Sequence, residues 1–276
     1  MTRSARRWRF DAGLLSPLLR RFWRIPRVFV HVARGLCTIW FVFPSLDADA
    51  RRARVRRWSR QLVHMMGVDI RMTGTLAHPN VLVVANHVSW LDIFALHAAG
   101  PVRFIAKAEI ARWPILGRLV AGVGTLFIDR ARRHDTHRIN GEVMAALRAG
   151  DIVAIFPEAT TSDGTGVLPF KGSLLQPIVD ADGAVQPVAI RYRTRAGERS
   201  TLPAYVDDDT FVDSFWRVSG AAELVVDIVA AAPLPARGTH RRALAQQAEA
   251  IIRSALAAPW SDFRLDKRGD PAGESP

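Results

Sequence analysis

Cysteine is almost missing from this chain: one residue of 276, Cys37, carries a thiol. A single thiol supports neither a disulfide framework nor a thiolate metal site. The eight histidines include no pair that combines metal-ligand spacing with carboxylate support. His134 and His137 lie three residues apart, but in a segment rich in Arg and Asp that indicates solvated side chains. We therefore expect no metal site and no disulfide.

The sequence also lacks a long apolar run. Its most apolar stretch, Val28 to Phe43, is interrupted by His31 and Arg34 and is shorter than the roughly 20 apolar residues that a spanning helix needs. The stretch begins too late, with no small-residue cleavage site after it, for a cleaved signal peptide. It predicts a helix that lies in, or partly enters, one leaflet of a membrane. A single-pass anchor is the second choice.

Positive charge is confined to one end of the chain. Residues 1–60 contain 15 Arg or Lys and three Asp or Glu, whereas residues 61–276 contain 23 of each sign. Trp8, Trp23, Trp40 and Trp58, half of all the tryptophans, also lie in the first segment. Tryptophan and arginine beside an apolar stretch are typical of a bilayer interface. We therefore interpret residues 1–60 as a basic, membrane-anchoring arm.

Residues 51–60, RRARVRRWSR, predict a basic helix at the end of this arm. Such a helix is attracted to anionic headgroups, which favours the cytoplasmic face of the inner membrane. A nucleic acid is a polyanion too, but no nucleic-acid-binding fold is recognisable, so we expect no such partner. The hydrophobic content of 49% agrees with a membrane-associated protein.

The stretch VLVVANHVSWLDIFAL, residues 81–96, carries the strongest chemical signal. Its first five residues predict a strand buried on both faces, and a helical spacing begins at Ser89. On one ideal helix His87 and Asp92 would point about 140° apart, so they meet only if His87 ends the strand and Asp92 lies in the first helical turn. A histidine held by a carboxylate on one ring nitrogen can accept a proton on the other. A single His–Asp residue pair of this kind is also common as a purely structural contact.

From residue 61 onward, short apolar runs alternate with helical stretches. Strands are predicted at 81–85, 103–106, 125–128, 151–156, 185–192 and 223–230, and helices near 113–121, 136–148, 172–179 and 240–257. This alternation predicts an α/β domain over residues 61–260, with a mainly parallel sheet flanked by helices. The polar residues 261–276 predict a loose tail.

Polar side chains follow three further runs. Arg130 comes after the strand at 125–128, Glu158 with Thr160 and Thr161 after the strand at 151–156, and Lys171 just before a predicted helix. Because the carboxyl ends of parallel strands share one edge of a sheet, these groups predict a site for an anionic acceptor that bears a hydroxyl.

Four blocks resemble, in this order, those of the membrane glycerolipid acyltransferase family, which includes the 1-acylglycerol-3-phosphate acyltransferases. The blocks are NHVSWLD (86–92), FIDR (127–130), FPEAT (156–160) and QPVAI (186–190), and the resemblance covers about residues 80–192. It implies that His87 removes the proton from the acceptor hydroxyl as the oxygen attacks an acyl thioester, and that Asp92 orients the imidazole. It also implies that Arg130 and Lys107 hold the acceptor on its phosphate side.

Two residues depart from the family pattern. Ala159 replaces a glycine, which strains the backbone if φ is positive there. Thr161 replaces an arginine that commonly follows Glu-Gly-Thr, so the phosphate clamp loses a cation unless Arg130, Lys107 and Lys171 compensate. The continuation TTSDG at 160–164 is similar to that of family members that acylate lyso-ornithine lipids.

The sequence thus predicts an enzyme, a membrane-bound O-acyltransferase with His87 and Asp92 as its catalytic pair. Its co-substrate would be acyl-CoA or acyl carrier protein, without a cofactor, because a thioester is already activated. The predicted acceptor is a lysolipid, first 1-acylglycerol-3-phosphate and second a lyso-ornithine lipid. A non-catalytic membrane-surface binding protein remains the alternative of another class. A soluble serine hydrolase is disfavoured, because no Gly-x-Ser-x-Gly elbow is present.

Overall fold

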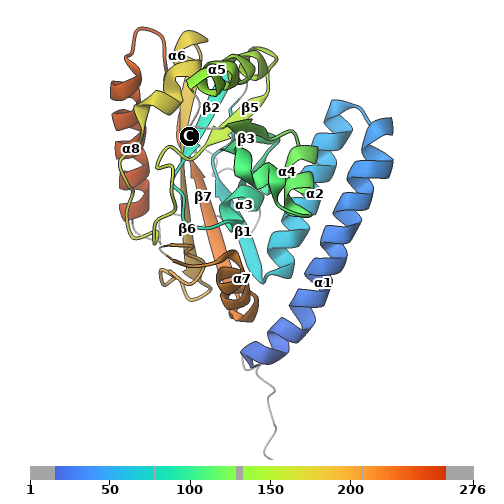
Figure 1. Cartoon of the computed structure of the whole chain (residues 1–276). Helices are drawn as coiled ribbons and strands as arrows, with labels where there is room; N and C mark the ends of the chain where they lie inside the picture. The colour runs from blue at the N-terminus through green and yellow to red at the C-terminus, as the bar shows by residue number, and fades with distance from the viewer. Residues whose placement is uncertain (1–15, 78, 129–132, 207, 259–276) are drawn as a thin grey trace, which may run out of the picture.

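A mixed, mainly parallel sheet organises the chain, as predicted (Figure 1). The computed structural model describes residues 16–77, 79–128, 133–206 and 208–258. In these residues the strands follow the order β1-β7-β6-β2-β5-β3-β4, and β8 pairs with β6. All neighbours are parallel except β6 with β7 and β6 with β8. The strands are β1 (Val68–Thr73), β2 (Val81–Ala85), β3 (Val102–Lys107), β4 (Leu126–Ile128), β5 (Ile152–Ile155), β6 (Ala184–Thr194), β7 (Leu224–Ala230) and β8 (Leu234–Pro235).

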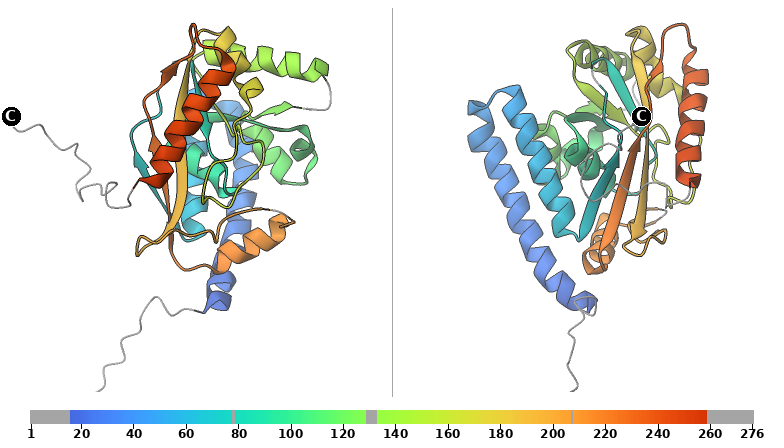
Figure 2. Two further views of the ribbon diagram at one scale, coloured as in Figure 1. Left: turned by 90° about the vertical axis from the view of Figure 1, so that its left-hand side faces the viewer. Right: turned by 180° about the vertical axis from the view of Figure 1, so that it is seen from behind.

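Helices cover both faces of this sheet (Figure 2). The α-helices are α1 (Pro17–Cys37), α2 (Ala48–Met65), α3 (Leu91–Ala99), α4 (Leu116–Gly122), α5 (Arg133–Arg148), α6 (Gln176–Asp180), α7 (Phe211–Gly220) and α8 (Arg241–Ala257). A π-helical turn (Thr38–Val42) and a 3-10 turn (Phe43–Ser45) join α1 to α2, and further 3-10 turns lie at Ala108–Arg112 and Gly172–Leu175. One apolar core lies between the sheet and α1, α2, α3 and α7, and a second lies between the sheet and α5, α6 and α8.

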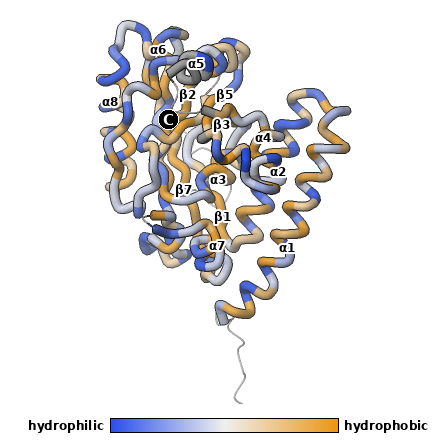
Figure 3. The backbone as a smooth tube through the Cα atoms, in the orientation of Figure 1, coloured by the Kyte–Doolittle hydropathy of each residue, from blue (hydrophilic) through white to orange (hydrophobic). Residues whose placement is uncertain are grey.

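Strand β2 lies in the middle of the sheet and contributes to both cores. Val81, Val83 and Ala85 belong to the core beneath α2 and α3, while Leu82 and Val84 belong to the core beneath α8. This is why the run VLVVA is apolar throughout: alternate side chains point to opposite faces, and both faces are covered. The hydropathy colouring of Figure 3 shows the same concentration of apolar residues in the central strands.

The N-terminal helices pack against each other and against the domain. His31 Nε2 lies 3.0 Å from the Trp58 carbonyl oxygen, and Trp58 Nε1 donates to the His31 carbonyl oxygen at 3.1 Å. The two rings stack at 4.7 Å between centroids. The helices approach so closely that a Cβ on Gly35 would lie 2.7 Å from Trp58 Nε1. Helix α2 therefore joins α1 to the main core and runs across residue 60, where we expected the arm to end.

Several arginines of the basic arm bind the ends of other helices. Arg20 Nε donates to the Gly220 carbonyl and Arg24 Nη1 donates to the Ala221 carbonyl, both at 2.8 Å at the carboxyl end of α7. Arg56 and Arg60 donate to the Ala98 carbonyl near the end of α3. Cations are stabilised at helix carboxyl ends, where backbone carbonyls lack partners. Part of the arm's positive charge therefore serves internal packing.

Candidate active site

His87 lies two residues after the end of β2, at the carboxyl edge of the sheet. The preceding Asn86 is fully buried and fixes this strand end: its side-chain amide donates to the Ile190 carbonyl at 2.9 Å, and its Oδ1 accepts from the Ile190 N–H at 2.7 Å. His87 thus leaves the sheet at a rigid point, next to β6. Its side chain is 18% exposed, so the ring is accessible from outside the core.

Asp92 holds the His87 ring from the first turn of α3. Its Oδ2 lies 2.9 Å from His87 Nδ1, and the side chain of Asp92 is fully buried. The same oxygen accepts the backbone N–H groups of Val88 at 2.7 Å and Ser89 at 2.9 Å. Oδ1 accepts the Tyr192 hydroxyl at 2.7 Å. The sequence-based geometry is confirmed, because the histidine lies outside the helix and the aspartate lies within its first turn.

These contacts determine which nitrogen of His87 is free to react. With Nδ1 donating to the buried carboxylate, Nε2 carries the lone pair. Within the described part of the chain, no group hydrogen-bonds to Nε2. The ring stacks on Phe156 at 3.9 Å between centroids with an interplanar angle of 8°. The imidazole is thus fixed by a carboxylate at its edge and an aromatic ring on its face.

Glu158 braces the loop that follows β5 against His87. Its Oε1 accepts the His87 N–H at 2.8 Å, and its Oε2 accepts the Leu168 N–H at 3.0 Å. Burial raises the pKa of Glu158, and the two N–H donors oppose that shift. Ala159 follows with φ of 63°, the left-handed conformation in which a glycine is unstrained. The departure from glycine at this position therefore carries a backbone cost.

The other predicted acceptor-binding residues are Thr160, Thr161, Lys171, Lys107 and Arg130. Thr160 is exposed in the same loop, while the hydroxyl of the half-buried Thr161 donates to the Tyr205 carbonyl. Lys171 is exposed at the start of the 3-10 turn Gly172–Leu175, and its N–H donates to the Pro157 carbonyl at 2.9 Å. Lys107 ends β3, though its side chain is outside the described part of the structure, as is the whole of Arg130. The roles of these five residues toward an acceptor stay predictions.

Three residues in this site were not predicted as functional from the sequence: Asn86, Phe156 and Tyr192. Asn86 is adjacent to His87 and Phe156 lies two residues before Glu158, so their place in two of the family-like blocks was the available signal. Tyr192 is 100 residues from Asp92 along the chain and gave no local signal. Burial and the neighbouring Asp92 carboxylate raise the pKa of Tyr192 well above its ordinary value, so its hydroxyl stays protonated as a donor.

The described residues offer no group of three or more His, Cys, Asp or Glu side chains that could hold a metal ion. What they do offer is a base with a free lone pair, held in one orientation at a sheet edge. This arrangement can remove a proton from a hydroxyl or similar group brought to His87 Nε2. The fixed ring orientation favours a single direction from which the hydroxyl approaches Nε2.

Comparisons with known proteins show which family the chain resembles. A family model described as Acyltransferase matches residues 68–191. A protein named 1-acyl-sn-glycerol-3-phosphate acyltransferase from Neisseria gonorrhoeae is 45% identical over 65% of this chain and 71% of its own length. A Pseudomonas aeruginosa protein named lyso-ornithine lipid O-acyltransferase is 36% identical over 89% of this chain and 98% of its own length.

The fold has a counterpart among solved structures. The crystal structure of the 1-acyl-sn-glycerophosphate acyltransferase from Thermotoga maritima superimposes with a TM-score of 0.66, at 20% identity, over 91% of this chain and 98% of that one. The matched family region contains the His87–Asp92 pair, the Glu158 loop and most of β6. From the family match, the full-length relative and the shared architecture together, we conclude that this chain is an enzyme of the acyltransferase family.

Proposed function

We propose that this enzyme moves a fatty acyl group from acyl-CoA or acyl carrier protein to the free hydroxyl of a lysolipid, with His87 as general base. The observation that carries this proposal is the His87–Asp92 contact of 2.9 Å, which leaves Nε2 as the proton acceptor. An acyl thioester is already activated, so the reaction needs a base and correct positioning more than a cofactor.

In this reaction Nε2 takes the proton of the acceptor hydroxyl while its oxygen attacks the thioester carbonyl. The resulting imidazolium is stabilised by Asp92, which is held by two backbone N–H groups and the Tyr192 hydroxyl. Collapse of the tetrahedral intermediate forms the ester and breaks the carbon–sulfur bond. The imidazolium then gives its proton to the leaving thiolate, which regenerates neutral His87.

The first-choice acceptor is 1-acylglycerol-3-phosphate, which gives phosphatidate. The Neisseria relatives named for this acceptor are 45% identical to the chain. Lys107, Arg130 and Lys171 are the cations proposed to hold the phosphate, and Thr160 is an exposed hydroxyl in the same loop as Glu158. Cations are the usual partners of phosphate oxygens in proteins.

A lyso-ornithine lipid is the second candidate acceptor, favoured by Thr161. Where related enzymes commonly have an arginine, this hydroxyl donates to the Tyr205 carbonyl and helps to fix the loop over His87. The Pseudomonas relative named for that lipid matches almost the whole of both chains. An acceptor with a carboxylate and an amine in place of phosphate has less need of the missing cation.

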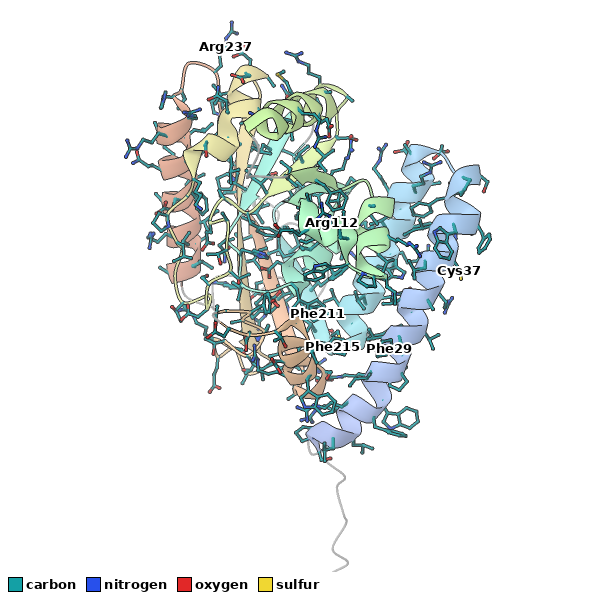
Figure 4. All side chains as sticks on the ribbon, in the orientation of Figure 1. Phe29, Cys37, Arg112, Phe211, Phe215 and Arg237 are labelled. Carbon is teal, nitrogen blue, oxygen red and sulfur yellow. The ribbon has the colours of Figure 1, made fainter. Side chains whose placement is uncertain are left out.

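We further propose that α1 holds the enzyme on the cytoplasmic face of the inner membrane. The helical segment Pro17–Ser45 is longer than the apolar run Val28 to Phe43 that we judged too short to span, and by length and composition it could cross a bilayer, with a mean hydropathy of 1.4 in its most apolar window. Val28, His31 and Gly35 are buried against the protein, whereas Phe22, Trp23, Phe29, Val30 and Phe41 are more than half exposed. One face packed on protein and one apolar face outward favour a helix lying in the interface. Cys37 is also exposed on α1 (Figure 4).

Acyl transfer by membranes that contain the protein tests the proposal. Labelled acyl-CoA or acyl carrier protein is supplied with either lysophosphatidate or a lyso-ornithine lipid, and the product is separated by thin-layer chromatography. Product from lysophosphatidate supports the first-choice acceptor, and product from the lyso-ornithine lipid alone supports the second. Binding to anionic vesicles with transfer to neither acceptor would favour a non-catalytic binding protein instead.

A further inference from the structure

An apolar cavity of about 60 Å3, partly open to the surface beside the exposed Arg54, lies where α1, α2, α3 and α4 meet. A single water needs roughly 15 Å3, so the cavity has room for more than one small group. Most of its wall is apolar: Ile39, Phe43, Trp58, Phe94, Leu119 and Val123 are among the lining residues. An apolar chain is the natural occupant of such a space.

Two buried polar side chains interrupt this apolar wall. His97 on α3 is 4% exposed and Ser59 on α2 is 1% exposed, and both line the cavity. Among the described residues, no group hydrogen-bonds to the His97 ring nitrogens or to Ser59 Oγ. Buried polar atoms are nearly always paired, because their desolvation is unfavourable without a partner. These two side chains therefore point to a polar atom supplied by whatever fills the cavity.

His97 is neutral under ordinary conditions, because burial lowers its pKa to about 4. A neutral imidazole offers one donor and one acceptor, and the Ser59 hydroxyl offers both as well. A ligand group that can both donate and accept therefore pairs with these two side chains whichever way their hydrogens are arranged. A hydroxyl meets this requirement, whereas a carboxylate has no proton to donate and an ammonium cannot accept.

A row of aromatic rings connects this cavity with the catalytic base. The His97 ring packs edge-on against Phe104 at 5.0 Å between centroids, and Phe104 stacks on Phe156 at 5.7 Å. Phe156 in turn stacks on His87 at 3.9 Å. For a donor whose thioester is at His87, only a distal part of the acyl chain would extend as far as this cavity.

We propose that the cavity selects acyl donors whose chain carries a hydroxyl group away from the thioester, held between His97 and Ser59. This specificity rests on the proposed acyl-transfer function. An unsubstituted chain fills the same space but leaves both polar side chains without partners. A site built to hydrogen-bond a substrate hydroxyl discriminates against the analogue that lacks it.

Two acyl donors that differ by one hydroxyl group test this specificity. Octadecanoyl-CoA and an octadecanoyl-CoA with one mid-chain hydroxyl are offered separately with the same lysolipid acceptor, and kcat/KM is measured for each. For two neutral hydrogen bonds we expect about a 10- to 100-fold preference for the hydroxylated donor. His97→Leu and Ser59→Ala should each bring that preference close to parity.

Thr38→Val is the matched control, because Thr38 also lines the cavity but its hydroxyl already donates to the Arg34 carbonyl at 2.8 Å. It should leave the preference between donors unchanged. His97→Gln retains hydrogen-bonding groups and keeps the comparison informative if His97→Leu folds poorly. Equal kcat/KM values for the two donors in the wild type would overturn the inference while leaving the acyltransferase function intact.

Binding of the free fatty acids repeats the comparison without chemistry. Isothermal titration of the wild-type protein with the hydroxylated and the unsubstituted octadecanoic acid should give a Kd at least about tenfold lower for the former. This readout separates the two proposals: if neither donor is transferred, the acyl-transfer function fails, yet the binding ratio still decides the specificity of the cavity. Equal Kd values would contradict the role of His97 and Ser59.

Discussion

Replacing Asp92 by Asn removes one negative charge while keeping the shape of the side chain that holds His87. The amide oxygen of Asn can take the place of Oδ2, which accepts from His87 Nδ1, Val88 and Ser89. Its NH2 group would then face the Tyr192 hydroxyl, which can rotate to accept a hydrogen bond in place of donating one. The variant should therefore fold with His87 close to its original orientation.

The catalytic loss follows from the charge alone. A hydrogen bond to a charged group contributes about 1.5–3 kcal/mol, and this bond gains that strength only when His87 becomes positive during the reaction. At about 1.4 kcal/mol per tenfold change in rate, kcat should fall about 10- to 150-fold. KM should stay unchanged, because the side chain of Asp92 is fully buried behind the imidazole and does not reach a substrate.

Steady-state kinetics of the wild type, Asp92→Asn and the control Asp49→Asn provide the assay. Asp49 is a matched aspartate in the first turn of α2, with its side chain 92% exposed, and its replacement should leave kcat and KM unaltered. Thermal denaturation establishes that each variant is folded. A folded Asp92→Asn enzyme with wild-type kcat would refute the reasoning and reduce Asp92 to a structural residue.

Three other predictions concern stability and membrane binding. Ala159→Gly should raise the free energy of unfolding by about 1 kcal/mol, because φ of 63° is unstrained only for glycine; a lower melting temperature would contradict this. His97 has a folded-state pKa of about 4 against an ordinary value of 6.5. Its contribution to the free energy of unfolding is therefore complete above pH 6.5 and is lost as the pH falls toward 4. Denaturation at pH 7 and pH 5 should differ by about 2 kcal/mol more in the wild type than in His97→Leu, and equal differences would refute this assignment. Phe22→Ser with Phe29→Ser should weaken sedimentation with anionic vesicles, since both side chains are more than half exposed on α1; unchanged sedimentation would place the membrane contact elsewhere.

The sequence allowed prediction of features that depend on neighbouring residues. The run VLVVA could be recognised as a central strand because both of its faces are apolar, and the strand-to-helix step at His87 followed from the spacing to Asp92. The mainly parallel sheet followed from the alternation of strands and helices. The helix over residues 51–60 was also correct, although α2 is longer, from Ala48 to Met65.

Features that depend on distant parts of the chain could not be predicted. Strand β1 has only one fully buried residue, Val68, so its sequence lacks a clear strand pattern; its pairing with β7 brings it into the sheet. The Tyr192 contact with Asp92 joins residues on β6 and α3. Helix α7, which carries Phe211 and Phe215 (Figure 4), was also missed. Both rings pack against Trp90, close in sequence to His87.

The contacts that the basic arm makes within the protein could not be predicted from the sequence either. Its charge could be counted from the sequence, but the use of Arg20 and Arg24 at the carboxyl end of α7 depends on how α1 crosses that helix. Similarly, the sequence raised the question of φ at Ala159, but only the fold supplied the value. Local pattern thus predicted the elements and the reactive pair, while tertiary packing determined what supports them.

The most direct test of the account is acyl transfer by His87→Ala, measured beside the wild type and His64→Ala. His64 is a control histidine with an 80% exposed side chain near Asp69, remote from the site in sequence. Loss of general-base catalysis should reduce the rate about 100- to 10,000-fold in His87→Ala, with an unchanged melting profile, and leave His64→Ala active. Wild-type transfer by a folded His87→Ala enzyme would contradict the central claim that His87 is the base.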